Sequence, residues 1–114
     1  MIGIIGAMDE EVEQIVAVMD IEREETKAQM TFKAGKLAGK DVVIVRSGIG
    51  KVNAAVCTQI LVDDFGVDYV INTGIAGSLK NEINIADIVI SDDVLHHDMD
   101  ATGFGYSENG YALI

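Results

Sequence analysis

The sequence predicts an α/β fold built on a mixed sheet with helices on both faces. The main evidence is a strand-then-glycine pattern that occurs three times: Ile2–Ile5 before Gly6, Val42–Val45 before Gly48, and Tyr69–Asn72 before Gly74. Short runs rich in Val and Ile are typical of strands that are covered on both faces. The first two runs are followed by helical patterns, at Asp9–Met19 and Lys51–Phe65. Strands that alternate with helices favour a largely parallel sheet.

The length and composition fit one domain, residues 1–114. The chain has 114 residues, of which 49% are hydrophobic and 24% are charged, and such a chain can fill a core. It contains no Pro and no low-complexity stretch, so no linker is indicated. No apolar run reaches the length that a bilayer span requires.

The first helix is predicted from a stripe of apolar side chains at helical spacing. The stripe consists of Met8, Val12, Ile15, Val16 and Met19. Asp9 fits the N-cap position, because a carboxylate there accepts hydrogen bonds from free helix N–H groups. Glu11 falls at the margin of the stripe, just after the first strand. In open α/β sheets, ligands bind at the carboxyl ends of strands.

Glu11 has two interpretations that the pattern alone leaves open. As an acid in the first helical turn, it would interact favourably with the helix dipole, by about 0.5 kcal/mol. As a carboxylate at the ligand-binding edge, it would act as a general base toward a bound water.

The segment between the two helices predicts an antiparallel meander. It contains three short strand-like stretches with turn signals at Gly35 and Gly39: Glu22–Thr26, Met30–Lys36 and Asp41–Arg46. A meander that enters a set of parallel strands makes the sheet mixed.

The C-terminal part is predicted to form one more strand, Asp87–Ser91, followed by an acidic, glycine-containing loop over Asp92–Ile114. The sequence ends on three apolar residues, Ala112, Leu113 and Ile114, which is unusual for a complete domain. We therefore expect a fold that is incomplete on its C-terminal side and that exposes sheet edges.

The charge distribution excludes several classes of partner. The net charge is −11, and the only Lys or Arg beyond Val52 is Lys80. Such a surface repels nucleic acid and anionic membranes, so a neutral or cationic small molecule is a better ligand. No basic region precedes the apolar start of the chain, and the single Cys57 forms no internal disulfide. These features predict a cytoplasmic protein.

The glycine turns argue against the common cofactor motifs. Gly48 and Gly50 open a helix, but the position of a third dinucleotide-binding glycine holds Asn53. No phosphate-binding motif of the Walker type is present either. The turn therefore predicts either a positive φ or a close approach of backbone to a ligand, and the segment from Gly74 to Gly77 has the same two interpretations.

No metal site is predicted. His96 and His97 are adjacent, and neighbouring side chains of a strand point to opposite faces, so the two cannot readily share an ion. No second cluster of metal-ligating residues completes a site.

Four motifs in register carry a resemblance to a known family. They are the eleven residues from Ile2 (IGIIGAMDEEV), the six from Ser47 (SGIGKV), the eight from Asn72 (NTGIAGSL), and the six from Asp87 (DIVISD), which His97-Asp98 and Phe104-Gly105-Tyr106 follow. The chain resembles the N-terminal part of the bacterial 5′-methylthioadenosine/S-adenosylhomocysteine nucleosidases, within the purine nucleoside phosphorylase superfamily. The resemblance extends over nearly the whole chain.

The resemblance implies an α/β/α sandwich and a hydrolase that releases adenine from a purine thionucleoside in methionine salvage, with no cofactor and no metal. Glu11 would activate the attacking water. The other implied site residues line the substrate: Met8 and Ile49 at the ribose and alkylthio group, Ile75, Ala76 and Gly77 beside the purine, and Ala101 and Phe104 in a segment lent to the neighbouring subunit of a homodimer.

Two departures from the family limit what the resemblance implies. Ile75 replaces a serine that many relatives carry, so a hydroxyl contact is lost. The purine-protonating Asp and the ribose-binding Glu of the family match no residue of this chain, and loss of a general acid costs about 10²–10⁴-fold in rate. We therefore expect little turnover from the isolated chain.

The alternatives are a non-catalytic dimerisation or nucleoside-binding module and, less favoured because basic residues are scarce, a phosphorolytic enzyme.

Overall fold

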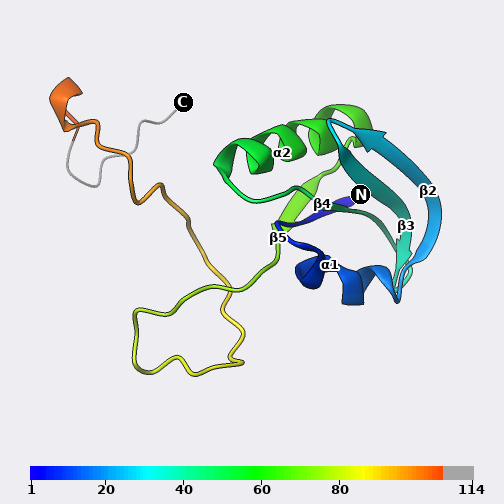
Figure 1. Cartoon of the computed structure of the whole chain (residues 1–114), viewed down its shortest axis with the longest axis horizontal. Helices are drawn as coiled ribbons and strands as arrows, with labels where there is room; N and C mark the ends of the chain where they lie inside the picture. Colours follow the sequence, from blue (N-terminus) through cyan, green and yellow to red (C-terminus); the bar gives the residue numbers. More distant parts are fainter. Residues whose placement is uncertain (107–114) are drawn as a thin grey trace. The chain divides into compact units, whose positions relative to one another are not determined.

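The computed structural model describes residues 1–106 and divides the chain into two compact units, Met1–Gly77 and Ser78–Ile114. The first unit contains the sheet and both α-helices (Figure 1). Residues 107–114, the end of the predicted acidic loop, lie outside the described residues. That residues 1–114 form the N-terminal part of a single domain stays a prediction.

The sheet of the first unit has five strands in the order β2-β3-β4-β1-β5. Their bounds are β1 Ile2–Gly6, β2 Asp20–Lys27, β3 Met30–Leu37, β4 Lys40–Arg46 and β5 Tyr69–Asn72. β1 pairs in parallel with both β4 and β5, whereas β2, β3 and β4 form an antiparallel meander. The mixed sheet and the meander that the sequence predicts are therefore confirmed.

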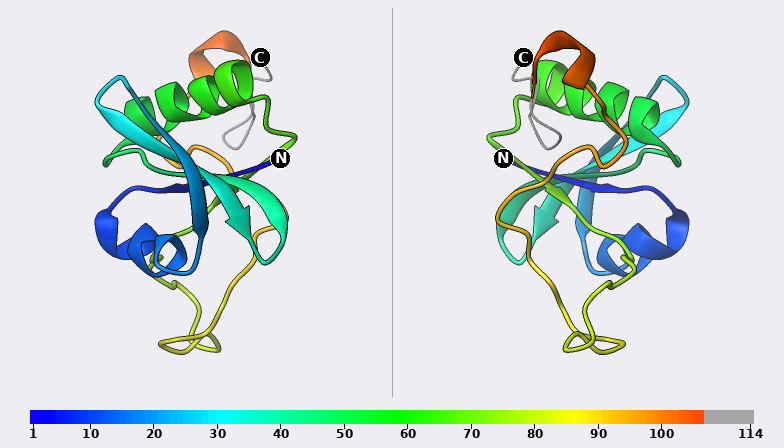
Figure 2. Two further views of the ribbon diagram at one scale, coloured as in Figure 1. Left: turned by 90° about the vertical axis from the view of Figure 1, so that its right-hand side faces the viewer. Right: turned by 90° about the vertical axis from the view of Figure 1, so that its left-hand side faces the viewer.

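Helices cover both faces of this sheet: α1 (Asp9–Val16) lies on one side and α2 (Lys51–Phe65) on the other (Figures 1 and 2). Alternate residues of β4 divide between the two faces, as the strand period requires. Val43 and Val45 belong to the cluster under α2, and Val42 and Ile44 to the cluster under α1. Burial on both faces explains why β4 has an unbroken apolar sequence.

The core under α2 is the larger of the two. Cys57 and Leu61 of the helix are fully buried against Phe32 and Val43 of the sheet. The ring of Phe65, at the end of α2, stacks on Phe32 with centroids 5.1 Å apart. These contacts fix α2, and with it the loop that leads from β4 into the helix.

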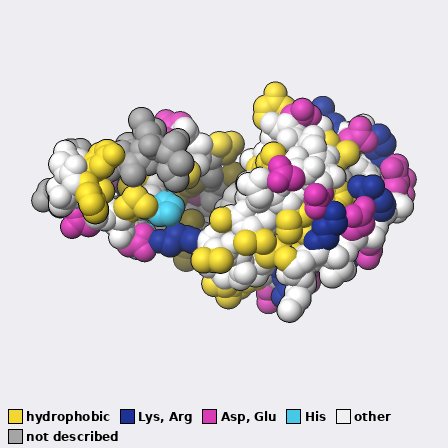
Figure 3. Space-filling view, turned by 90° about the horizontal axis from the view of Figure 1, so that it is seen from above, with side chains coloured by type: hydrophobic (Ala, Val, Ile, Leu, Met, Phe, Trp, Pro, Cys, Tyr) yellow, Lys and Arg dark blue, Asp and Glu magenta, His cyan; other side chains and the backbone are white. Residues whose placement is uncertain are grey.

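The opposite side of α2 is also apolar, although it is exposed. Ile49, Val52, Val56 and Val62 have exposed side chains along the loop and helix. Figure 3 looks onto this side and shows hydrophobic side chains gathered where α2 lies. A helix that is apolar all round is typical of an element covered on both sides.

The first helix is shorter than predicted, and its predicted N-cap is wrong. α1 ends at Val16 rather than Met19, because the N–H groups of Val18 and Met19 bond to carbonyls three residues back, and the chain enters β2 at Asp20. The N-cap is Met8, and Asp9 is the first helical residue. The apolar stripe is nevertheless confirmed, since Val12 is buried and Met19 packs on the same cluster.

The predicted strand Asp87–Ser91 is wrong. In the described part of the second unit, the one regular element is the short 3₁₀ helix η1, Thr102–Phe104. The side chains of Ile88, Val89 and Ile90 are exposed rather than packed against a neighbour. Because a strand forms only by hydrogen bonding to another strand, an apolar run by itself does not form one.

No helix among the described residues is long and apolar enough to span a membrane.

Removing a buried side chain from α2 tests the core that holds this helix. Leu61→Ala should lower the free energy of unfolding by about 2–5 kcal/mol, because it leaves a cavity against the sheet. The neighbouring Val62 is 48% exposed, and Val62→Ala should change it by about 0.5 kcal/mol or less. Urea unfolding of the two variants measures the difference, and equal losses would contradict this packing.

Candidate active site

Three parallel strands bring their carboxyl ends to one edge of the sheet. β1 lies between β4 and β5, and two backbone hydrogen bonds extend the pairing beyond the strands. Ser47 N–H donates to the Gly6 carbonyl at 2.9 Å, and Thr73 N–H donates to the Ile5 carbonyl at 2.9 Å. The loops after β1, β4 and β5 therefore start from fixed points at the edge where α/β sheets bind ligands.

Glu11 reaches this edge from the first turn of α1. Its Oε2 accepts hydrogen bonds from the N–H groups of Ala7, at 2.7 Å, and Met8, at 3.1 Å. Its Oε1 accepts one from the N–H of Ile75, at 3.2 Å. The half-buried carboxylate thus joins α1 to the loop after β5, across 64 residues of sequence.

These hydrogen bonds hold the Glu11 carboxylate in its ionised form. The bond from Ile75 N–H, followed by that from Met8 N–H, lowers the pKa of Glu11 below its ordinary value of 4.5 against a smaller opposing effect of desolvation. A carboxylate that is ionised at neutral pH is in the right state to accept a proton from water.

Two glycines lie close to side chains of α1: Gly74 to the Glu11 carboxylate, and Gly6 to Val12 and the Cβ of Glu11. A Cβ added to Gly74 would lie 2.6 Å from Glu11 Oε1, and one added to Gly6 would lie 2.6 Å from Val12 Cγ1 and 3.1 Å from Glu11 Cβ. Such distances are far shorter than van der Waals contact. Gly6 and Gly74, two of the three glycines of the strand-then-glycine pattern, therefore allow a close approach by side chains of α1.

The loop after β4 is the third loop at this edge of the sheet, beside the loops after β1 and β5. Gly48 and Gly50 have positive φ values of 82° and 103°, so the tight-turn interpretation of these glycines is confirmed. The Asn53 side chain donates to the Ile49 carbonyl at 2.8 Å, and the Ser47 hydroxyl donates to the Gly48 carbonyl at 2.8 Å. The Ile49 side chain itself is exposed.

The structure brings together some of the predicted site residues. Met8, Glu11 and Ile75 are joined by hydrogen bonds, and Ala76 and Gly77 continue the same loop with exposed positions. Ala101 and Phe104 belong to the second unit, where Ala101 is the half-buried N-cap residue of η1 and the Phe104 ring is exposed. The roles assigned to all eight residues stay predictions.

The backbone donors to Glu11 could not be identified from residue types. Ala7 and Ile75 contribute N–H groups, not side chains. One signal was available for the cap: a Glu at the third helical position reaches back to the N-cap backbone in a capping box. Asp9 instead pairs with Arg46 at the end of β4, with 3.3 Å between Oδ1 and Nε.

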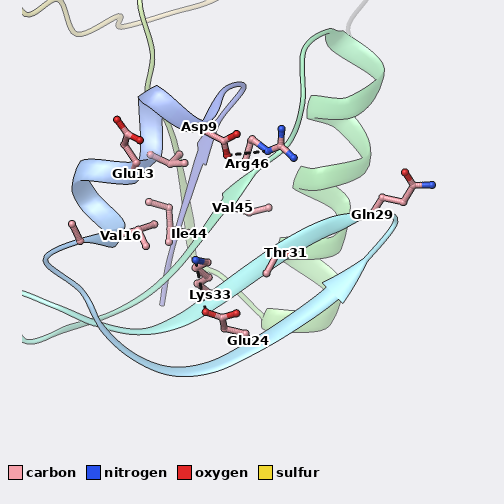
Figure 4. Close-up of a pocket in the computed structure, with 12 residues that line it drawn as sticks. Asp9, Glu13, Val16, Glu24, Gln29, Thr31, Lys33, Ile44, Val45 and Arg46 are labelled. Atoms are coloured by element: carbon pink, nitrogen blue, oxygen red, sulfur yellow. Dashed lines mark ion pairs between the residues drawn. The ribbon is translucent and has the colours of Figure 1, made fainter.

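A hollow of about 600 Å³ lies beside this site, between α1 and the curved meander (Figure 4). Its floor includes Val12, Val16 and Ile44, and Glu11 is not among its lining residues. Two ion pairs, Asp9–Arg46 and Glu24–Lys33, lie at its rim. Because both cations there are paired, the hollow lacks a free charge to attract an anion.

Among residues 1–106, no group of three or more His, Cys, Asp or Glu side chains is arranged to hold a metal ion.

The fold and the carboxylate at its edge define an α/β protein with a candidate site at the carboxyl ends of parallel strands. The chain belongs to the phosphorylase superfamily, whose family model matches residues 1–114. It is 57% identical over 105 residues to a 5′-methylthioadenosine/S-adenosylhomocysteine nucleosidase from a Marinomonas strain, a match that covers 92% of this chain and 46% of that protein.

Solved structures of such nucleosidases have the same fold. The enzyme from Colwellia psychrerythraea, in complex with adenine, superposes with a TM-score of 0.88 at 47% identity, covering 97% of this chain and 46% of that chain. The enzyme from Neisseria meningitidis, in complex with methylthio-immucillin-A, gives 0.92 at 40% identity, covering 99% and 49%. The predicted α/β/α fold is confirmed, and the chain spans about half the length of the relatives it matches.

The depressed pKa of Glu11 makes a prediction about stability. Because this pKa is lower in the folded than in the unfolded chain, ionised Glu11 stabilises the fold fully above its unfolded pKa, and the contribution is lost as pH falls through the folded pKa. Wild type should therefore exceed Glu11→Gln in free energy of unfolding at neutral pH, and the gap should shrink on acidification. Urea unfolding across this range measures the gap, and a gap independent of pH would contradict the assignment.

Proposed function

We propose that this chain supplies the water-activating part of a purine nucleosidase, which hydrolyses the N-glycosidic bond of 5′-methylthioadenosine and S-adenosylhomocysteine. The observation that carries the proposal is the Glu11 carboxylate, ionised and oriented by three backbone N–H groups at the carboxyl edge of the sheet. The names of the relatives, which the chain matches over 92% of its length, support the choice of reaction.

The proposed chemistry balances as a hydrolysis. The glycosidic C–N bond breaks and its electron pair goes to the purine, while the sugar becomes cation-like. The purine takes up a proton from a general acid that lies outside this chain. Water adds through its oxygen to the sugar carbon and gives one proton to the Glu11 carboxylate, which later releases it to solvent. An anion near the sugar also stabilises the developing positive charge.

Hydrolysis is favoured over phosphorolysis by the charges of the chain. A phosphate co-substrate is usually held by arginines that present paired donors. The two arginines, Arg23 and Arg46, are both in ion pairs, with Glu25 at 3.2 Å and with Asp9 at 3.3 Å.

The remaining site residues are assigned by their place in the family motifs. Met8 and Ile49 would line the ribose and the alkylthio group, and Ala76 and Gly77, with Ile75, would lie beside the purine. Their positions on the loops after β1, β4 and β5 agree with this assignment. Ala101 and Phe104 would complete the alkylthio pocket of a neighbouring subunit.

A homodimer is proposed on the same grounds, and the exposed apolar side of α2 supports it. The exposed side chains of Ile49, Val52 and Val56 are three and four residues apart, as on one face of a helix, and a patch of this kind marks an interaction surface. The buried, free Cys57 agrees with a reducing compartment, and we place the reaction in the cytoplasm, where it would serve methionine salvage.

Adenine release tests the proposed activity. Replacing the matching N-terminal part of the Marinomonas relative with this chain gives a chimera of full length, which should release adenine from methylthioadenosine. Glu11→Gln should lower its kcat by about 10²–10⁴-fold, as expected for loss of a general base. The neighbouring exposed Glu10→Gln is the matched control and should retain activity.

An inactive but folded chimera that still binds methylthioadenosine would instead favour the nucleoside-binding module. A Glu11→Gln chimera as active as its Glu10→Gln control would contradict the role of Glu11. The isolated 114-residue chain should show little or no turnover in the same assay.

Charge placed on the exposed side of α2 tests the dimer. The double substitution Val52→Glu and Val56→Glu should convert the chimera from dimer to monomer in analytical ultracentrifugation, because it puts like charges into the apolar patch. Val18→Glu, at a side chain that is 71% exposed beyond the end of α1, should leave a dimer. A double variant that remains dimeric would exclude this face of α2 from the interface.

A further inference from the structure

The two oxygens of Glu11 differ in how many hydrogen bonds they have left to make. A carboxylate oxygen accepts about two hydrogen bonds through its lone pairs. Oε2 already accepts two, from Ala7 and Met8, whereas Oε1 accepts one, from Ile75. Oε1 is therefore the oxygen with a free lone pair, and Oε2 is occupied by capping the helix.

We infer that the backbone of Gly74 and Ile75 is a positioning element that fixes Oε1 of Glu11 as the oxygen that takes the proton of the attacking water. The inference rests on the proposed function for the role of the water. It deepens that function by assigning the base to one atom and its orientation to two residues whose side chains do no chemistry.

Gly74 leaves the space that the Glu11 carboxylate occupies. An added Cβ would lie 2.6 Å from Oε1, 3.1 Å from Cδ and 3.4 Å from Oε2, so any side chain at this position displaces the carboxylate. Gly77, in the same loop, has nothing within 4 Å of an added Cβ. Only one of these two glycines is therefore required by the carboxylate.

The position of the Ile75 N–H is fixed by the pairing of β5 with β1. The bond from Thr73 N–H to the Ile5 carbonyl, 2.9 Å long, carries the pairing of β1 and β5 to within two residues of it. The Ile75 side chain is 86% exposed and contributes little packing. The functional group at this position is thus the backbone N–H, and not the side chain.

The ionisation of Glu11 is controlled mainly by its hydrogen bonds and not by neighbouring charged groups. β1 and the segment 72–77 carry no ionisable side chain. On α1 the ionisable residues are Asp9, Glu10 and Glu13, and at the end of β4 it is Arg46, which is paired with Asp9. The bond from Ile75 is the largest of the influences that lower the pKa of Glu11.

NMR titration of the 114-residue chain tests the positioning directly. The Glu11 carboxyl carbon and the Ile75 amide should titrate together in the wild type, because one hydrogen bond joins them. Gly74→Ala should raise the pKa of Glu11 toward its ordinary value and remove the pH-dependent shift of the Ile75 amide, whereas Gly77→Ala should change neither. Glu11→Gln should also shift the resonance of the Ile75 amide. If the Gln oxygen accepts from Ala7 and Met8, its NH₂ group faces the Ile75 N–H, and two donors cannot form a hydrogen bond.

An Ile75 amide that does not follow Glu11 in the wild type would overturn the inference without any variant, and so would a Gly74→Ala chain that titrates like the wild type. Neither measurement uses a nucleoside or turnover, so its failure is distinct from failure of the proposed hydrolysis.

The kinetic counterpart uses the chimera. Gly74→Ala should lower kcat by about 10²-fold, the usual effect of misplacing a catalytic group by about 1 Å, with a much smaller change in KM. Val18→Ala, at an exposed side chain that has no place in the proposed site, is the control and should keep the wild-type kcat. Equal kcat values for the two variants, or a loss confined to KM, would overturn the assignment of Gly74 as a positioning residue.

Discussion

Three backbone N–H groups, those of Ala7, Met8 and Ile75, converge on the carboxylate of Glu11, and the rest of the candidate site depends on this convergence. A buried or half-buried N–H must find an acceptor, and an ionised carboxylate is the strongest acceptor that a side chain offers. The same contacts therefore begin α1, fix the loop after β5, and keep Glu11 ionised. Stability and the proposed chemistry share one interaction, so a change to it affects both.

The sheet makes this interaction possible by the way its strands are ordered. β1 lies between two parallel neighbours, so the chain leaves β1, β4 and β5 at one edge. The two core clusters hold α1 and α2 against opposite faces, which fixes the direction in which each loop turns. Gly6 and Gly74 then allow contacts that no side chain at those positions would permit. The edge is thus specified by backbone geometry more than by the identity of exposed side chains.

Local patterns predicted the elements whose signals lie within a few residues. β5 and α2 have the predicted bounds, and α2 ends where Gly66 adopts the left-handed conformation that closes many helices. The strand over Asp87–Ser91 failed because strand formation depends on a partner, which a local pattern does not reveal. For the site, residue types and motif order indicated Glu11 itself. They could not indicate Ile75 N–H as its partner, since every residue except Pro carries that group and only the pairing of β5 with β1 brings this one to the carboxylate.

The most direct test of the central claim is a crystal structure of the full-length chimera with methylthio-immucillin-A, the ligand of the Neisseria meningitidis structure. We expect an ordered water between the ligand and Glu11, within about 2.6–3.2 Å of Oε1, while Oε2 keeps its bonds to Ala7 and Met8. A water bound to Oε2, or a ligand whose sugar lies away from Glu11, would contradict it.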